Sequence, residues 1–275
     1  MTLIASLPMY DHPGAHAATD QWWGTIAAHA RDRGGFDDLP DSLDRSGIRE
    51  DHWRSSNLGL SQTCGFPLRQ TFHPYLAVLG APRYAVEGCT GHDYSSAFVV
   101  RAEDSGTSVA AMEGRRLACN GRDSQSGYNV VKAKIGALDR GDNMNFPFFS
   151  EMLISGNHAN SVAMVKAGTA DLAAIDAVSL ALIQRHAPEN FSGLTVIDYS
   201  APGPCLPYVT SNQRTADEIS ALRAAITAAM ADPSLSDARA DLRLDGFDVV
   251  DADEYVRIDA ITAQGQGVVL APEDG

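Results

Sequence analysis

Serine hydroxyls and a glycine stand where a helix is expected to begin, within residues 118–135 (ACNGRDSQSGYNVVKAKI). A short apolar run ends at Asn120, and a helix-like segment follows Ser126 and Gly127. The first N–H groups of a helix have no partner inside the helix and carry a partial positive charge, so such a start attracts anions. Ser124 or Ser126 acting as an ordinary N-cap explains the same residues.

Polar residues also follow other expected strands, at points where each strand leads into a helix. Tyr10 follows the first strand, and Gln62 and Thr63 precede a Gly-Phe-Pro turn. His158 and Asp176 lie at the starts of two further helices. Each residue has a simpler interpretation as a cap or a surface group, and Asp176 suits an N-cap. Their shared place at strand-to-helix turns favours a binding site instead.

The elements that must position these residues alternate between strand and helix. Apolar runs and 3.6-residue periodicity predict strands and helices, respectively. The expected strands are 2–8, 58–61, 75–86, 95–102, 115–120, 151–156, 170–176, 194–200 and 206–211. The expected helices are 14–33, one that opens near 126, 157–167, 177–186, 215–231 and 232–240. Thr215 and Glu218 have the spacing of a capping box. This alternation predicts an α/β fold.

Two joints, near residues 90–94 and 198–203, bracket a central block with its own strand–helix alternation. We therefore expect two lobes, a discontinuous lobe 1 (1–91 and 199–275) and lobe 2 (92–198). Each lobe is expected to hold a mainly parallel sheet flanked by helices. Ligands of such folds bind where loops leave the carboxyl ends of strands, so the gap between the lobes is the expected ligand site.

Composition excludes several classes of function. The chain of 275 residues is 44% hydrophobic and 20% charged, which is typical of a folded soluble protein. Its net charge of −14, with no basic stripe, argues against a nucleic-acid or membrane-surface partner. It has no Gly-x-Gly-x-x-Gly, P-loop or His-Glu-x-x-His motif. No cofactor is expected. No metal is expected either, because Cys64, Cys89, Cys119 and Cys205 lack metal-ligand spacing. Buried free thiols are the expected state, and one or two disulfides are the alternative in an oxidising compartment.

The first residues, MTLIASLPMYDHPG, have no basic segment and no long apolar run. Neither a signal peptide nor a membrane helix is therefore expected there. On this observation the chain either works in the cytoplasm or has lost a leader.

Two stretches together carry a resemblance to a known family. LACNGRDSQSGYNVVKA (117–133) contains a Ser-x-Ser-Gly-Tyr loop, and ISGNHANSVAMVKAGTADLAAIDAVSLAL (154–182) contains a Gly-x-His helix start and a V-x-x-G-x-A-D-x-A-x-x-D segment. They resemble the phosphate/phosphonate-type substrate-binding proteins of ABC transporters, which have the type 2 periplasmic-binding fold. PMYD and SQTCGFPL resemble the first and second cleft loops of that family, so the resemblance covers nearly the whole chain in order.

The resemblance implies a role for each matching residue. The oxyanion-binding helix start would comprise Ser124, Gln125, Ser126, Gly127 and Tyr128. His158 resembles a histidine that donates to a phosphonate oxygen, and Asp176 resembles an acidic residue that can hold a ligand amine. Tyr10, Gln62 and Thr63 resemble contacts from the other lobe. Gln125 stands where the commonest version of the loop has a hydroxyl residue.

The function implied is capture of a small anionic solute, a phosphonate- or phosphate-like oxyanion or an organic analogue, without chemical change. Hinge closure would enclose the solute, as in other two-lobed binding proteins. The resemblance also implies a periplasmic monomer with an ABC permease and ATPase as partners and with no membrane insertion.

The alternative is a cytoplasmic enzyme or ligand sensor on the same fold, for example an enzyme of cofactor-precursor biosynthesis. Ser126, His158 and Asp176 are the residue types of a hydrolase triad, but no Gly-x-Ser-x-Gly elbow precedes the serine. A Schiff-base lysine at a strand end would favour an enzyme. The three lysines, Lys132, Lys134 and Lys166, all fall on predicted helices instead.

Overall fold

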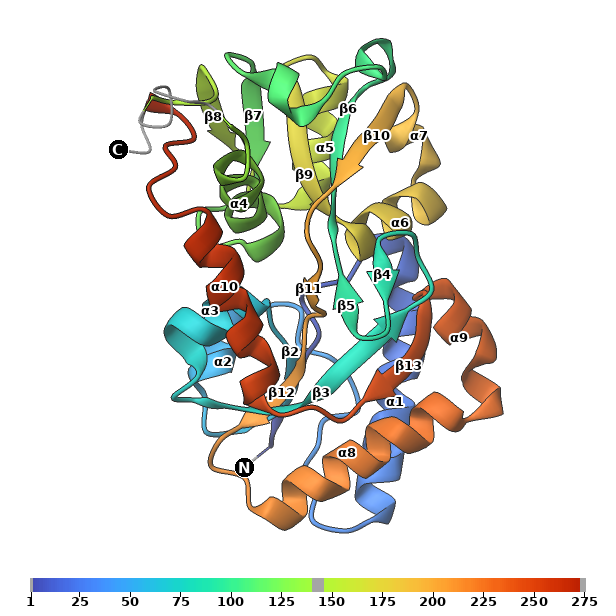
Figure 1. The fold of residues 1–275 in the computed structure, drawn as a ribbon. Coiled ribbons are helices and arrows are strands. Elements are labelled where there is room, and N and C mark those ends of the chain that lie inside the picture. The colour runs from blue at the N-terminus through green and yellow to red at the C-terminus, as the bar shows by residue number, and fades with distance from the viewer. Residues whose placement is uncertain (1, 140–145, 273–275) are drawn as a thin grey trace. The chain divides into compact units, whose positions relative to one another are not determined.

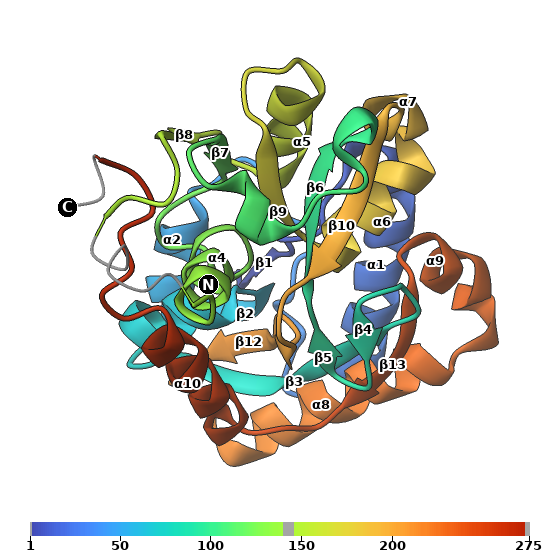
Figure 2. The same ribbon diagram turned by 45° about the horizontal axis from the view of Figure 1, so that its top comes forward.

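A computed structural model describes residues 2–139 and 146–272 and divides the chain into two compact units (Figures 1 and 2). Unit 1 comprises Met1–Ala85, Thr90–His92 and Pro204–Val256, and unit 2 comprises Val86–Cys89, Asp93–Gly203 and Arg257–Gly275. The predicted lobes differ from these units by a few residues at the two joints and by a longer segment at the C-terminus. The C-terminal segment belongs to unit 2 because its helix α10 (Arg257–Gln264) packs against α4 (Val130–Gly136).

Unit 1 is built on a five-stranded sheet. Its order is β1 (Ile4–Ser6), β2 (Leu58–Gln62), β12 (Tyr208–Ser211), β3 (Leu76–Tyr84) and β13 (Leu244–Asp248). β1 and β2 pair in parallel, and the other neighbours pair antiparallel. The helices are α1 (His16–Asp32), α2 (Arg49–Arg54), α3 (Gly65–Pro67), α8 (Ala216–Ala231) and α9 (Ser236–Asp241). Shorter helical turns span Pro13–Ala15, Leu68–Phe72, Pro233–Leu235 and Ala252–Val256.

The core of unit 1 follows from the apolar faces of its helices. Trp22, Trp23 and Ile26 of α1 are buried, and α1 packs against α8 and α9. The predicted capping box of α8 is confirmed. The Glu218 amide donates to Thr215 Oγ1 at 3.2 Å, and Glu218 Oε2 accepts from the Thr215 amide at 2.7 Å.

Unit 2 is built on a second five-stranded sheet (Figure 1). Its order is β10 (Leu194–Tyr199), β6 (Ser96–Arg101), β9 (Leu172–Asp176), β7 (Arg116–Cys119) and β8 (Glu151–Ile154). Besides α4 and α10, its helices are α5 (His158–Lys166), α6 (Ala177–His186) and α7 (Pro188–Phe191), with turns at Ala102–Asp104, Val109–Met112 and Gln125–Asn129. The short strands β4 (Cys89–Thr90), β5 (Asp93–Tyr94) and β11 (Gly203–Pro204) lie where the chain passes between units.

The α/β class is confirmed, but both sheets are mixed, whereas mainly parallel sheets were expected. β7, β8 and β9 are parallel, while β6 runs antiparallel to β9 and β10. β12 likewise runs antiparallel to both of its neighbours in unit 1. β6 and β12 are the first long strands after the chain enters each unit from the other. Neither strand directly follows a helix of its own unit, so no crossover connection requires it to run parallel to its neighbours.

The sheet of unit 2 is buried on both faces. Along β6, Phe98 and Val100 belong to one apolar core, and Ala97 and Val99 belong to a second. The first core includes residues of α4 and α10, and the second includes residues of α5 and α6. Helices therefore cover both faces and leave the strand ends for polar loops.

Among the residues that the structure describes, no helix combines the length and the hydrophobicity that a membrane span needs.

Candidate functional site

Three loops of unit 2 leave the same edge of its sheet. β9, β7 and β8 are adjacent and parallel, with Ala118 paired to Ala173 and Cys119 paired to Ile154. Their carboxyl ends therefore lie side by side. The predicted serine loop follows β7, His158 follows β8, and Asp176 ends β9.

The serine loop enters its helix through a wide turn. The Gly127 amide donates to Ser124 Oγ at 3.0 Å, so Ser124 is the N-cap that the simpler interpretation described. The turn Gln125–Asn129 is π-helical, with the Asn129 amide donating to the Ser124 carbonyl at 3.0 Å. Such turns are frequent at functional sites, and the first amides of the turn have no partner inside the helix. The turn can therefore donate to an anion even though Ser124 is a cap.

Glycine is required at position 127 because Asn120 lies against it. A Cβ atom on residue 127 would lie 1.7 Å from Asn120 Oδ1 and 3.4 Å from Ser124 Oγ. Asn120 Oδ1 is itself buried and has no hydrogen-bond partner among the described residues. The turn is thus packed tightly around polar groups.

Ser126 and His158 meet although they come from different loops. Ser126 Oγ lies 2.8 Å from His158 Nε2 and 3.4 Å from Ser124 Oγ. His158 is the first residue of α5, directly after the N-cap Asn157, whose side chain accepts from the Asn160 amide at 2.8 Å. Two helix starts are therefore joined by a hydroxyl–imidazole contact.

Burial lowers the pKa of His158 to about 4, so the imidazole is neutral at neutral pH. Its Nδ1 is buried and has no partner in the described part of the chain. The carboxylate of Asp176 does not fill this place but caps α6. Its Oδ1 accepts from the amides of Val178 at 2.8 Å and Ser179 at 3.0 Å. A hydrolase triad needs a carboxylate on that nitrogen to orient the base, so the arrangement does not fit one.

The stability of the protein should depend on pH through His158. Its folded pKa of about 4 lies below the ordinary value of 6.5, so the unfolded chain binds more protons between these values. Stability should therefore fall as pH drops below 6.5, by roughly 2 kcal/mol at pH 5. Thermal unfolding from pH 7 to 5 should show a smaller fall for His158→Gln than for the wild type. His73→Gln, at an exposed histidine, is the control, and an equal slope for all three proteins would contradict the prediction.

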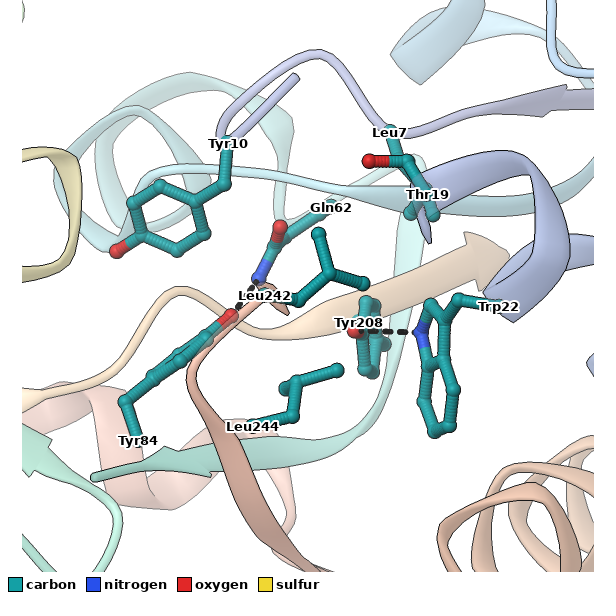
Figure 3. Close-up of a pocket in the computed structure, with 9 residues that line it drawn as sticks. All are labelled: Leu7, Tyr10, Thr19, Trp22, Gln62, Tyr84, Tyr208, Leu242 and Leu244. Carbon is teal, nitrogen blue, oxygen red and sulfur yellow. Dashed lines mark hydrogen bonds between the residues drawn. The ribbon is translucent and has the colours of Figure 1, made fainter. Parts of the chain in front are cut away.

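Two predicted residues of unit 1, Tyr10 and Gln62, line one pocket (Figure 3). The pocket has a volume of about 30 Å³, room for one or two water-sized groups. Its other lining residues are Leu7, Thr19, Trp22, Tyr84, Tyr208, Leu242 and Leu244. The Tyr10 and Tyr84 rings meet edge to face with centroids 5.4 Å apart, and Gln62 Nε2 donates to Tyr84 Oη at 3.3 Å. The lining is mainly aromatic and aliphatic, with the polar side chains of Thr19 and Gln62 and no carboxylate.

Thr63 does not line that pocket. It is fully buried, its amide donates to the Pro207 carbonyl at 3.2 Å, and its hydroxyl donates to the Cys64 carbonyl at 3.3 Å. The structure thus brings Tyr10 and Gln62 together in unit 1 and gathers the serine loop and His158 in unit 2. That the two sets meet in one cleft stays a prediction, as does a contact between Asp176 and a ligand amine.

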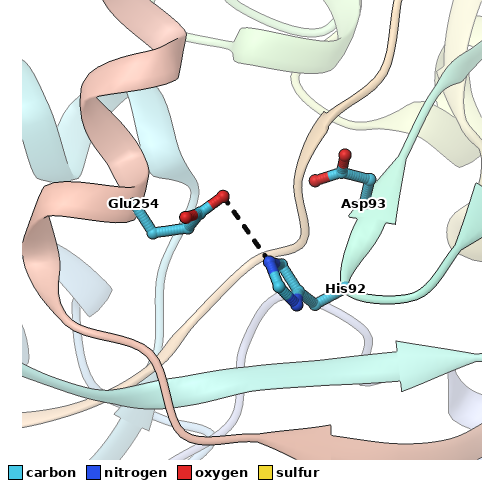
Figure 4. Close-up of side chains that lie close together, drawn as sticks. All are labelled: His92, Asp93 and Glu254. Atoms are coloured by element: carbon cyan, nitrogen blue, oxygen red, sulfur yellow. Dashed lines mark ion pairs between the residues drawn. The ribbon is translucent and has the colours of Figure 1, made fainter.

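A histidine outside the predicted site, His92 of unit 1, lies between carboxylates. Its Nδ1 is 2.9 Å from Asp248 Oδ2. Its Nε2 is 3.5 Å from Glu254 Oε1 (Figure 4). Asp248 also pairs with Arg83 at 2.8 Å. Carboxylates of unit 1 therefore face both ring nitrogens of His92.

The thiols and lysines give no nucleophile to the site. None of the four cysteines forms a disulfide. Burial raises the pKa of Cys119 to about 11, so its reactive thiolate form is rare at neutral pH. The three lysines lie on helices, as predicted: Lys132 and Lys134 on α4, and Lys166 on α5. Lys134 Nζ pairs with Asp198 at 2.6 Å.

Sequence reasoning missed the residues that support the serine turn. Asn129 Nδ2 donates to Gln125 Oε1 at 2.7 Å and to Thr262 Oγ1 at 2.8 Å. The four-residue spacing of Gln125 and Asn129 was a local signal for the first bond. Thr262 had no such signal, because it lies on α10, more than a hundred residues away in the sequence.

Two α/β units, one of which gathers hydroxyl and imidazole groups at the ends of parallel strands, define the class of two-lobed solute-binding proteins. Solved structures share the fold at low sequence identity. A binding protein component of an ABC phosphonate transporter from Pseudomonas aeruginosa is 17% identical, with a TM-score of 0.68 over 96% of this chain and 87% of that chain. PhnD1 from Prochlorococcus marinus, in complex with methylphosphonate, is 12% identical, with a TM-score of 0.70 over 97% and 98%. XAC2383 from Xanthomonas citri, bound to chloride, is 17% identical, with a TM-score of 0.70 over 96% and 97%.

The chain belongs to the family of periplasmic substrate-binding proteins of ABC phosphonate transporters, whose family model matches residues 73–255. A search of curated proteins gives no match. The resemblance drawn from the serine loop and the Gly-x-His helix start is therefore confirmed at the level of the family and the fold.

Proposed function

We propose that unit 2 binds the oxyanion of a small phosphonate- or phosphate-like solute, without chemical change, at the serine turn and His158. The observation that carries this proposal is the 2.8 Å contact between Ser126 Oγ and His158 Nε2, which joins two helix starts. Both helix starts follow neighbouring parallel strands, β7 and β8.

The donors suit an anion although none of them is charged. Hydrogen bonds to an ionised acceptor are about twice as strong as bonds between neutral groups. The hydroxyl of Ser124 and the first amides of the turn can each donate one. The Ser126–His158 pair can donate one more, because its other proton lies in the 2.8 Å contact between the hydroxyl and the imidazole. Backbone and hydroxyl donors of this kind hold anions locally, even in a chain with a net charge of −14.

The same geometry supports binding rather than turnover. A general base works best with a pKa near the operating pH, and that of His158 is lowered to about 4. In addition, no described carboxylate orients its Nδ1. We propose that the protein is a monomer that delivers its solute to an ABC permease and ATPase in the periplasm.

We further propose that Tyr10 and Gln62 contact the organic part of the solute. Their pocket in unit 1 is lined mainly by aromatic and leucine side chains, with Thr19 and Gln62 as polar members and without a carboxylate, so it suits an alkyl group better than a charged amine. A small alkyl phosphonate is the ligand class that this lining favours.

Replacing Ser126 with alanine should weaken binding of methylphosphonate by roughly tenfold or more, because a hydrogen bond to a charged group is lost. Isothermal titration calorimetry with methylphosphonate, phosphate and sulfate measures the change. Ser150→Ala is the matched control, since Ser150 directly precedes β8 and therefore lies at the amino ends of the parallel strands, whereas the serine turn follows their carboxyl ends. Unchanged affinity in Ser126→Ala would contradict the proposed site, and release of inorganic phosphate from methylphosphonate would indicate an enzyme instead.

A further inference from the structure

We propose that the side-chain amide of Gln125 donates a hydrogen bond to the bound oxyanion, and that Asn129 and Thr262 position this amide. The inference deepens the proposed function and rests on it. It makes α10, a helix outside the serine-loop motif, part of the binding machinery of unit 2.

A chain of hydrogen bonds fixes the direction in which each of these groups donates. Thr262 Oγ1 donates its one proton to the Ile258 carbonyl at 2.9 Å, since a carbonyl can only accept. Thr262 Oγ1 must therefore accept from the Asn129 side chain, at 2.8 Å, and the Asn129 atom facing it must be Nδ2. The same Nδ2 lies 2.7 Å from the Gln125 side chain, so the Gln125 atom facing it must be the acceptor Oε1.

The other end of the Gln125 side chain is consequently its NH2 group. Gln125 is 2% exposed, and its Nε2 is buried with no hydrogen-bond partner among the described residues. A buried donor without an acceptor is unfavourable, and an acceptor that reaches it recovers that free energy. In the sequence Gln125 stands between Ser124 and Ser126, whose hydroxyl oxygens are 3.4 Å apart. A ligand oxygen at these serines would be the acceptor that the amide lacks.

Glycines hold α10 close enough to α4 for the chain of hydrogen bonds to form. A Cβ atom on Gly136 would lie 2.1 Å from the Gln264 carbonyl oxygen, and one on Gly265 would lie 2.6 Å from Lys132 Cβ. Both glycines lie where these helices meet in unit 2, and α10 begins five residues before Thr262. The position of Thr262 relative to Asn129 is therefore set by backbone packing.

The proposal is tested by a double-mutant cycle with methylphosphonate and phosphate as ligands, measured by calorimetry. Gln125→Ala and Thr262→Val should each weaken binding roughly tenfold, because each leaves the oxyanion without an oriented amide donor. The double variant should bind no more weakly than Gln125→Ala alone, since Thr262 acts through Gln125. Thr262→Ser, which keeps the hydroxyl, should bind within about twofold of the wild type.

Gln125→Glu is a second test of the amide contact, and it leaves Thr262 unchanged. Its carboxylate can still accept from Asn129, but its second oxygen would face the anion as an acceptor. Its affinity should fall by roughly a hundredfold or more. Thermal unfolding without ligand establishes that each variant is folded.

Additive losses in the cycle, or equally weak binding by Thr262→Ser and Thr262→Val, would overturn the positioning role. Wild-type affinity in Gln125→Glu would overturn the amide contact. If the wild type binds and Ser126→Ala weakens it, either result leaves the proposed function standing. If the wild type binds neither methylphosphonate nor phosphate, the proposed function fails, and the inference fails with it.

Discussion

Replacing Asp171 with alanine is expected to lower the free energy of unfolding by about 2–3 kcal/mol, because charged hydrogen bonds from two arginines to a buried carboxylate are lost. Asp171 is 5% exposed and precedes β9 directly. Its Oδ1 accepts from Arg101 at 2.9 Å, and its Oδ2 accepts from Arg116 Nε and from the Arg116 amide, each at 3.0 Å. Arg101 ends β6 and Arg116 begins β7, so one carboxylate joins three neighbouring strands.

The pKa of Asp171 shows that this carboxylate is held in its charged form. Burial alone would raise the pKa, but hydrogen bonds from Arg116 and Arg101 outweigh it and lower the pKa to about 2. Because the folded value lies below the ordinary 3.8, the contribution is present above pH 3.8 and is lost as pH falls through 2. It amounts to roughly 2 kcal/mol. The wild type should therefore lose more stability than Asp171→Ala between pH 4 and 2.

Urea unfolding at pH 7 measures the main effect, and Glu103→Ala is the matched control. Glu103 also pairs with Arg101, at 3.1 Å, but its side chain is 75% exposed, so its removal should cost less than about 1 kcal/mol. A similar loss of unfolding free energy in Asp171→Ala and Glu103→Ala would contradict the role given to Asp171. Asp171 lies at the amino end of β9, away from the serine turn, so the affinity of folded Asp171→Ala for methylphosphonate should be unchanged.

The position of the candidate site in unit 2 could be predicted from sequence because its residues follow apolar runs directly. Ser124, Ser126 and His158 each stand just beyond an expected strand, and such strands meet at one edge once they lie parallel. The contact between Ser126 and His158 follows from this arrangement, because their loops leave neighbouring parallel strands. Residue type could not decide whether Asp176 is a cap or a ligand residue. The structure shows that its Oδ1 caps α6, and a contact with a ligand stays a prediction.

The sequence analysis did not predict two elements that are stabilised by partners distant in the sequence, β13 and α10. β13, with the sequence LDGFD, has two aspartates and a glycine, which are poor strand formers, and it is held by its antiparallel pairing with β3. α10 carries few apolar residues, of which Ile258 and Ile261 are buried. Its place in unit 2 depends on glycine contacts with α4 that no local pattern encodes. The positioning of Gln125 by Thr262 was out of reach for the same reason.

Replacing Gly136 with alanine should lower the free energy of unfolding by about 3 kcal/mol and also weaken methylphosphonate binding. The new methyl group would lie 2.1 Å from the Gln264 backbone oxygen and 3.3 Å from Val268 Cγ2, so α10 would have to move off α4. That movement would separate Thr262 from Asn129 and release the amide of Gln125.

Gly24→Ala is the control for the change from glycine to alanine in a helix. Nothing lies within 4 Å of a Cβ atom on Gly24, so this variant should be more stable than the wild type by roughly 0.5–1 kcal/mol. Urea unfolding and calorimetry on both variants separate the two effects of Gly136→Ala. Because the turn Gln125–Asn129 leads into α4 and is tied to α10 through Thr262, stability and affinity should fall together. A destabilised Gly136→Ala that binds methylphosphonate as tightly as the wild type would mean that α10 supports the fold of unit 2 without controlling the serine turn.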